Sequence, residues 1–349
     1  MGLIAEKNQT RIRGNRPECG CMGAFRLFVL LFAVCMALTT VQPVLAADTG
    51  ARVTTNVVSS GTNWSGFTVG NLDTSDDNRA TNDTNTDYGV VSDFSFGVPA
   101  GAQIDGIQVD VEISNSRNNQ TVNYAVALSG NNGSGWTTAK PDSIYDNVDE
   151  TLTLGGPSDD WGWTWGDGGF SNANFQLRIY RTGGTGSIRV DLIQVTVYYT
   201  EPSYTQASFR GRDDDDDEAD ATWKAAADTN WTQKVDENFR VRFVVQETAG
   251  ISAADKTFQL EYNRNGGGWN DVTGASSVVR AWASPNVADG ADTTQQVGSG
   301  TFVTPNAGFD EVNGLAGGTS LDFSGSDEVE VEYCVQIRSA DASSFDTIQ

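Results

Sequence analysis

The sequence of 349 residues contains no histidine. This absence excludes Ser-His-Asp and Cys-His catalysis, histidine-ligated zinc or haem, and pH switching by imidazole. Carboxylates are abundant, but no spacing among them singles out the pair that a glycosidase needs. We therefore expect that the protein is not an enzyme.

Basic residues are also few: 22 Lys and Arg stand against 46 Asp and Glu, which gives a formal net charge of −24. Nucleic-acid binding depends on neutralisation of phosphates by basic side chains, so this balance excludes nucleic acid as a partner. A strongly acidic chain favours solubility and the binding of divalent cations. Structural calcium is therefore the one cofactor that the composition suggests.

One apolar run near the N-terminus, residues 27–38, is too short for a typical membrane span. Arg26 precedes it, and Val-Leu-Ala ending at Ala46 offers small residues for cleavage. Residues 1–46 are thus predicted to be a signal peptide, with cleavage after Ala46 or Ala47 and no membrane span in the mature chain. The segment before the run is long for a signal peptide, which favours translation starting at Met22.

Cysteine is scarce, and only Cys334 lies beyond the predicted signal peptide; the other three are Cys19, Cys21 and Cys35. No internal disulfide can then form in the mature chain. Cys334 alternates with apolar residues, so we expect it to be a small buried side chain. The signal peptide predicts a protein that is secreted and acts outside the cell or on its surface.

Helical periodicity is absent, and residues 47–200 instead show apolar runs separated by Gly, Asn and Asp clusters, as in an all-β fold. The clearest runs are residues 52–58, 90–98, 104–113, 121–128, 151–154, 175–180 and 187–199. In the last run Ile188 and Val190 share a face with Leu192, and then the alternation slips by one from Ile193 onward. Such a slip predicts a β-bulge or a corner.

The segments beginning Phe94-Ser-Phe-Gly-Val-Pro, Asp160-Trp-Gly-Trp-Thr-Trp and Val190-Asp-Leu-Ile-Gln-Val resemble a jelly-roll module of secreted bacterial and phage-related surface proteins. Their shape is also similar, more loosely, to galactose-binding-like and carbohydrate-binding sandwiches. The resemblance implies a jelly-roll β-sandwich over residues 47–200. It concerns folding motifs, so it carries fold and not activity.

After a linker at residues 201–203 the strand pattern restarts, with alternating runs at residues 239–245 and 329–335. Together with residues 204–210, 221–226 and 256–262, they resemble an immunoglobulin-like module of large secreted bacterial proteins. The resemblance implies an immunoglobulin-like sandwich over residues 204–349. In that module a last strand would continue past residue 349, so we expect either a truncated chain or an open sheet edge that a neighbouring copy of the protein fills.

Two groups of residues are candidates for binding sites. On a strand, Trp161, Trp163 and Trp165 would share one face, as in the aromatic platforms on which sugar rings stack, and Trp136 is a further candidate. The alternative is that the row packs against the core. Oxygen ligands for calcium are concentrated in two acidic segments, although neither fits an EF-hand and both could be solvated loops. The candidate ligands are Asp73, Asp76, Asp77, Asp83, Asp87, Asp213, Asp215 and Asp217.

These features favour a non-catalytic structural or adhesive cell-surface protein built of β-sandwiches. The alternative hypothesis is a carbohydrate-binding protein that holds extracellular polysaccharide on the jelly roll. A virion fibre is a third class, which the export signal argues against. Exposure of the tryptophans discriminates between the first two hypotheses.

Overall fold

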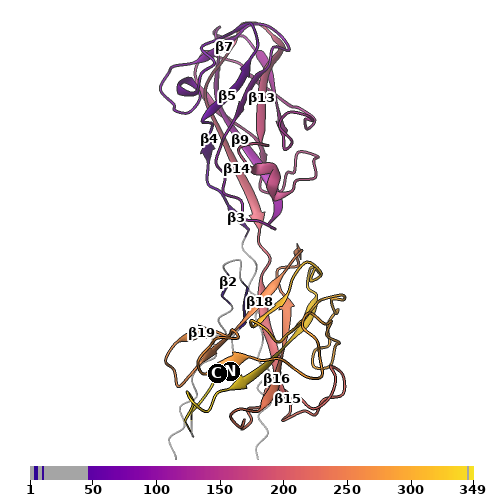
Figure 1. The fold of residues 1–349 in the computed structure, drawn as a ribbon. Helices are drawn as coiled ribbons and strands as arrows, with labels where there is room; N and C mark the ends of the chain where they lie inside the picture. Colours follow the sequence, from indigo (N-terminus) through magenta and orange to yellow (C-terminus); the bar gives the residue numbers. More distant parts are fainter. Residues whose placement is uncertain (1–3, 7–9, 12–45, 344–345) are drawn as a thin grey trace, which may run out of the picture. The chain divides into compact units, whose positions relative to one another are not determined.

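The computed structural model describes residues 4–6, 10–11, 46–343 and 346–349, and these residues confirm an all-β protein with β-sandwich architecture (Figure 1). The only helical elements described are two 3-10 turns, η1 (Val69–Asn71) and η2 (Asp167–Phe170). The chain divides into two compact units between Glu201 and Pro202. We call them the N-terminal sandwich and the C-terminal sandwich. The predicted signal-peptide run, residues 27–38, lies outside the described residues.

The N-terminal sandwich encloses one core between two antiparallel sheets. One sheet has the strand order β11-β10-β13-β8-β5, and the other has β12-β9-β14-β7-β6, with β3 and β4 also pairing with β14. The strands are β3 (Ala47–Asp48), β4 (Arg52–Val53), β5 (Asn56–Ser60), β6 (Trp64–Ser65), β7 (Ala80–Asn82), β8 (Gly89–Ser92), β9 (Gln103–Asn115), β10 (Val122–Ser129), β11 (Lys140–Ile144), β12 (Glu150–Gly156), β13 (Gln176–Gly184) and β14 (Ile188–Thr200).

The phase slip in β14 is a register shift against β9 between Val190 and Leu192. This confirms the predicted bulge and makes Asp191 the residue without a partner in the ladder. The expectation that Leu192 shares a face with Ile188 and Val190 is wrong: Val190 and Ile193 both face the core, whereas Leu192 is only half-buried and lies outside the core cluster. One extra residue in a strand reverses the side-chain alternation beyond it, which is why Asp191 is carried to the edge of the core.

The strand predicted over residues 90–98 is too long, because β8 ends at Ser92. Asp93 and Ser95 both have positive φ, 59° and 52°, which breaks the extended backbone. The irregular segment still buries Phe94 and Phe96, whose rings stack with centroids 5.4 Å apart. The alternation of apolar residues here therefore reflects burial without a strand.

The C-terminal sandwich contains residues 202–349 and two short strands from the N-terminus. One sheet has the order β15-β16-β24-β20 with β21 beside β24; another has β19-β18-β1-β2 with β22 beside β18, and β17 pairs with β23. The strands are β1 (Ile4–Glu6), β2 (Thr10–Arg11), β15 (Tyr204–Asp213), β16 (Asn238–Glu247), β17 (Ser252–Ala253), β18 (Thr257–Asn263), β19 (Trp269–Asp271), β20 (Val279–Ala281), β21 (Phe309–Asp310), β22 (Leu315–Gly317), β23 (Phe323–Ser324) and β24 (Glu328–Ile337). The predicted runs at residues 239–245 and 329–335 form β16 and β24, which pair along their length.

The predicted open edge of this sandwich is partly filled by the chain itself. β1 pairs with β18 from Ile4 opposite Leu260, and Ile348 bridges to Arg264 beyond the end of β18. A cavity of about 1080 Å³ lies beside this edge, lined by core side chains such as Phe239 and Tyr262.

Candidate functional site

The tryptophan row does not form the strand that would give it one face. Residues 161–166 are turn and irregular backbone, and Trp161 has a φ of 57°. Trp161 is 2% exposed, and its Nε1 donates a hydrogen bond to the carbonyl oxygen of Ile107 at 2.8 Å. Trp161 therefore belongs to the core and offers no face to a ligand.

Trp163 and Trp165 are half-buried, with ring centroids 6.1 Å apart and planes tilted by 42°. Trp165 packs on Phe170 and Phe175, at centroid distances of 5.1 Å and 6.0 Å, so its ring is part of the core wall. Trp163 lies over Gly135, where any Cβ would come within 2.9 Å of the indole. The two rings are tilted against each other and do not form a flat platform.

The fourth candidate, Trp136, lies in a different aromatic group on the outer face of the five-stranded sheet. The guanidinium carbon of Arg178 is 4.5 Å from the Trp136 ring centroid, 4.9 Å from that of Tyr88 and 5.9 Å from that of Tyr180. Tyr88 and Tyr180 meet edge to face with centroids 4.8 Å apart. We call Tyr88, Trp136, Arg178 and Tyr180 the aromatic–arginine cluster.

The alternation of β13 explains why the cluster faces outward. Leu177 and Ile179 are fully buried in the core, so Arg178 and Tyr180 between and after them point to the opposite face. The neighbouring strand β10 places Ala127 opposite Arg178 and Ala125 opposite Tyr180. These small side chains leave the rings and the guanidinium standing above the sheet. Tyr88 is 40% exposed.

The predicted calcium ligands of the first acidic segment are spread along it. Asp73, Asp76 and Asp83 accept hydrogen bonds from their own turns, through Thr74, Asn78 and Thr84 respectively. Asp87 accepts from the backbone N–H of Asn63 at 2.7 Å. Of the five residues, only Asp77 joins a group of carboxylates.

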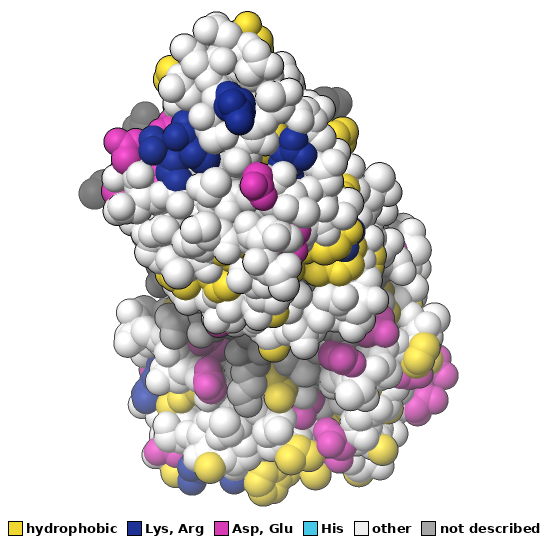
Figure 2. All heavy atoms as spheres, turned by 90° about the horizontal axis from the view of Figure 1, so that it is seen from above, with side chains coloured by type: hydrophobic (Ala, Val, Ile, Leu, Met, Phe, Trp, Pro, Cys, Tyr) yellow, Lys and Arg dark blue, Asp and Glu magenta, His cyan; other side chains and the backbone are white. Residues whose placement is uncertain are grey.

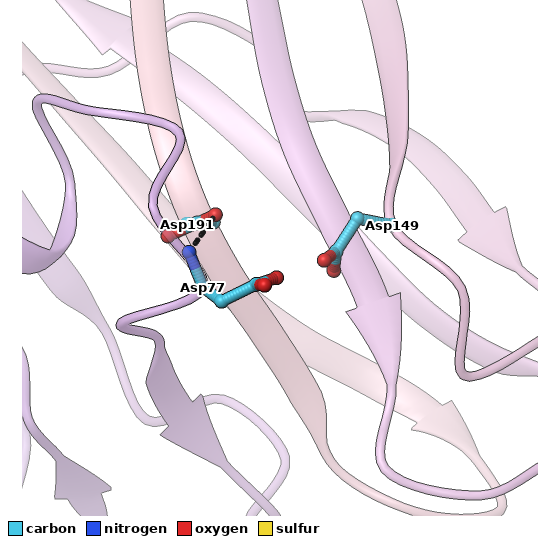
Figure 3. A group of neighbouring side chains, drawn as sticks. All are labelled: Asp77, Asp149 and Asp191. Carbon is cyan, nitrogen blue, oxygen red and sulfur yellow. Dashed lines mark hydrogen bonds between the residues drawn. The ribbon is translucent and has the colours of Figure 1, made fainter.

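That group consists of Asp77, Asp149 and Asp191, each of which offers an oxygen within 4.8 Å of the others (Figure 3). Asp191 is the bulge residue of β14, 1% exposed, and it accepts a hydrogen bond from the backbone N–H of Asp77 at 3.0 Å. Arg79 forms ion pairs with both Asp77 and Asp149. A metal ion would therefore have to displace Arg79, and calcium stays a prediction for this loop.

The surroundings shift the pKa values of Asp149 and Asp191 in opposite directions. The hydrogen bond from Arg79 lowers the pKa of Asp149, and the same bond raises the pKa of Arg79. Burial raises the pKa of Asp191, with nearby Asp149 and Asp76 adding to the shift. The Arg79 guanidinium thus stabilises the ionised form of Asp149, whereas burial makes the ionisation of Asp191 unfavourable.

The second acidic segment folds back onto the outer face of β16 and β24. Its outward residues serve the turn: Asp213 pairs with Lys224, Asp215 accepts from the N–H of Thr222, and Asp217 accepts from those of Ala219 and Asp220. Its other residues point inward. Asp214 lies 3.3 Å from Arg240, and Glu218 pairs with Arg242.

Beneath this turn lies a network of fully buried ions. The side chains of Arg212, Arg240, Arg242, Glu330 and Glu332 are all 0% exposed. Arg242 donates to Glu330 at 2.9 Å and also pairs with Glu332. The acidic segment at residues 213–218 therefore covers Arg240 and Arg242, which the side-chain alternation of β16 directs away from the apolar core.

The candidate site residues missed by sequence reasoning are Tyr88, Arg178, Tyr180, Asp149 and Asp191. A signal for two of them was present, because the run at residues 175–180 alternates Phe, Leu and Ile with Gln, Arg and Tyr. Period-two alternation places the second set on the solvent face. No local pattern could bring Trp136 or Tyr88 beside them.

Comparisons with known proteins identify no family for this chain. No family model matches it, and no curated protein matches it. Among solved structures, a match is found to the CBM22-1–GH10 modules of endo-1,4-β-D-xylanase 10B from Clostridium thermocellum, complexed with xylohexaose. The identity is 12%, the TM-score is 0.25, and the match covers 43% of this chain and 28% of that one. A likeness this weak establishes neither fold nor ligand, and the resemblance to modular surface proteins stays a prediction.

Within the described residues, none of the helical segments is long and apolar enough to span a membrane.

Proposed function

We propose that this protein is a non-catalytic adhesive module of the cell exterior, and that it attaches to its target by binding polysaccharide on the outer face of the N-terminal sandwich. The observation that carries the proposal is the aromatic–arginine cluster. It places three aromatic rings around one guanidinium on a sheet face, with Tyr88 40% exposed.

The chemistry of this face suits a sugar ring. The CH face of a pyranose is apolar and packs on an aromatic ring, while its hydroxyls need polar groups nearby. Tyrosine, tryptophan and arginine combine large contact areas with hydrogen-bonding tips, and the rigid rings of tyrosine and tryptophan lose little conformational entropy when a ligand binds. Arg178 and Tyr180 stand on β13, which is paired with β10, and Tyr88 directly precedes β8, so these side chains are positioned by the sheet before binding, whereas Trp136 reaches Arg178 from the loop after β10.

The adhesive part of the proposal rests on the sequence features of export and on the absence of histidine. It predicts attachment without chemical change of the target. The purified chain would hold a polysaccharide and release it intact.

The test is a pull-down of the full chain on cellulose, xylan, chitin and polygalacturonate, with affinity electrophoresis for soluble polymers. We expect retention on at least one polymer and its loss on Trp136→Ala or Tyr88→Ala. The matched control is Trp282→Ala, which removes a 39% exposed tryptophan stacked on Arg280 in the C-terminal sandwich. Retention on no polymer, or loss in the control variant alone, would refute the proposal and leave a structural surface protein as the remaining hypothesis.

A further inference from the structure

Among the residues that the structure describes, six cations stack on aromatic rings, and five of them, all except Arg178, share one property. Each has a polar partner that satisfies its charge or its N–H groups: Lys140 pairs with Asp159, Arg210 donates to Ala225, Arg212 pairs with Glu332, Arg242 pairs with Glu330, and Arg280 donates to Gln336. The ring contact therefore accompanies an internal polar contact in all five.

Arg178 differs from them. Within the described part of the chain, its guanidinium has no hydrogen bond and no ion pair, although its Nε is buried. Trp136, Tyr88 and Tyr180 surround it with rings that supply no carboxylate. Arg210 and Arg280 also lack a carboxylate, but each donates to a neutral oxygen, whereas the structure gives the guanidinium of Arg178 neither kind of acceptor.

We propose that the ligand of the aromatic–arginine cluster is an acidic polysaccharide, and that Arg178 binds a uronate carboxylate on it. This inference rests on the proposed function and names its ligand class. A guanidinium presents two parallel N–H groups that match the two oxygens of a carboxylate, and hydrogen bonds between charged groups are stronger than neutral ones. Stacking between rings holds the plane of Arg178 before the carboxylate arrives.

The charge of the chain bears on this specificity. The chain as a whole is acidic, so a polyanion is repelled everywhere except where basic groups gather. Figure 2 shows Lys and Arg side chains gathered on one part of the surface seen from above, with acidic side chains beside them. Local basic groups on an acidic protein direct a polyanion to one place.

The experiment compares two forms of one polymer that differ in the carboxylate alone. The full chain is titrated with polygalacturonate and with fully methyl-esterified polygalacturonate, and the dissociation constants are measured by calorimetry. Loss of one charge-assisted contact predicts binding of the ester at least about tenfold weaker. This comparison uses the unmodified protein, so it does not depend on a variant that folds.

Variants then assign the contact. Arg178→Gln should reduce the preference for the free acid to near unity, and Arg178→Lys should restore part of it, because the charge returns without the planar fork. Urea unfolding confirms that each variant is folded. Trp282→Ala again serves as the control and should keep the full preference.

The outcomes separate the two proposals. Binding of both polymer forms with equal affinity, dependent on Trp136, would overturn the acidic ligand and keep polysaccharide binding. Tighter binding of dextran sulfate than of polygalacturonate would overturn the carboxylate assignment. Binding of no polymer would overturn both proposals.

Discussion

The buried ions of the C-terminal sandwich give a prediction whose size follows from the structure. Glu332 is 0% exposed, and its carboxylate lies 3.1 Å from Arg240 and 3.4 Å from Arg212, with Arg242 also paired to it. Glu332→Gln keeps the shape of the side chain and removes the charge that three guanidinium groups share. Removal of one partner from a buried ion pair costs about 3–5 kcal/mol, because the other charges stay buried without compensation.

The assay is urea unfolding of the full chain, with tryptophan fluorescence as the readout. With a urea dependence of about 2 kcal/mol per molar, a cost of about 4 kcal/mol lowers the midpoint of the C-terminal sandwich by about 2 M. The matched control is Glu237→Gln, which breaks the surface pair with Lys234, whose side chains are 56% and 79% exposed. Exposed pairs contribute about 0–1 kcal/mol, so the control should shift the midpoint by less than about 0.5 M.

The transition of the N-terminal sandwich serves as an internal reference and should not move. If Glu332→Gln shifts the midpoint no more than Glu237→Gln does, then the reasoning that ties the buried network to stability is wrong.

Two further predictions concern the acidic group and the sheet edge. Asp191→Asn should raise the melting temperature at pH 7 in the presence of a chelator. Burial raises the pKa of Asp191, so above its unfolded pKa the native state carries the free-energy cost of ionising a buried carboxyl, and the amide removes this cost. The gain in melting temperature should shrink towards pH 4, and a fall in melting temperature at pH 7 would contradict the prediction. Removal of residues 1–46 takes β1 from the edge of β18 beside the 1080 Å³ cavity, so the shortened chain should self-associate with rising concentration in analytical ultracentrifugation, and a strictly monomeric result would count against an open edge.

Much of the fold could be predicted from the sequence, because strand alternation is a local property. The runs at residues 239–245 and 329–335 become β16 and β24, and the phase slip predicted after Leu192 is the bulge of β14, which lies at Asp191. The same reasoning failed where apolar residues alternate in the sequence but the backbone is not a strand. Phe94 and Phe96 are buried from irregular backbone, and the alternating tryptophans lie in turns.

The candidate site is decided by contacts that no local pattern contains. Trp136 was a candidate from its residue type, but Arg178 is 42 residues further along the chain. Arg178 is on β13, while Trp136 and Tyr88 come to it from two separate connections between strands. Likewise, Asp191 meets Asp77 because a bulge turns it towards a loop 114 residues earlier in the chain.

The sequence by itself determined which residues alternate, which segments carry charge and which chemistry is excluded by the lack of histidine. Only the tertiary structure decided which outward residues become neighbours and which charges are buried. The physical reason is that side-chain periodicity is set by the backbone of one strand, whereas the pairing of strands and the covering of a face depend on the whole core.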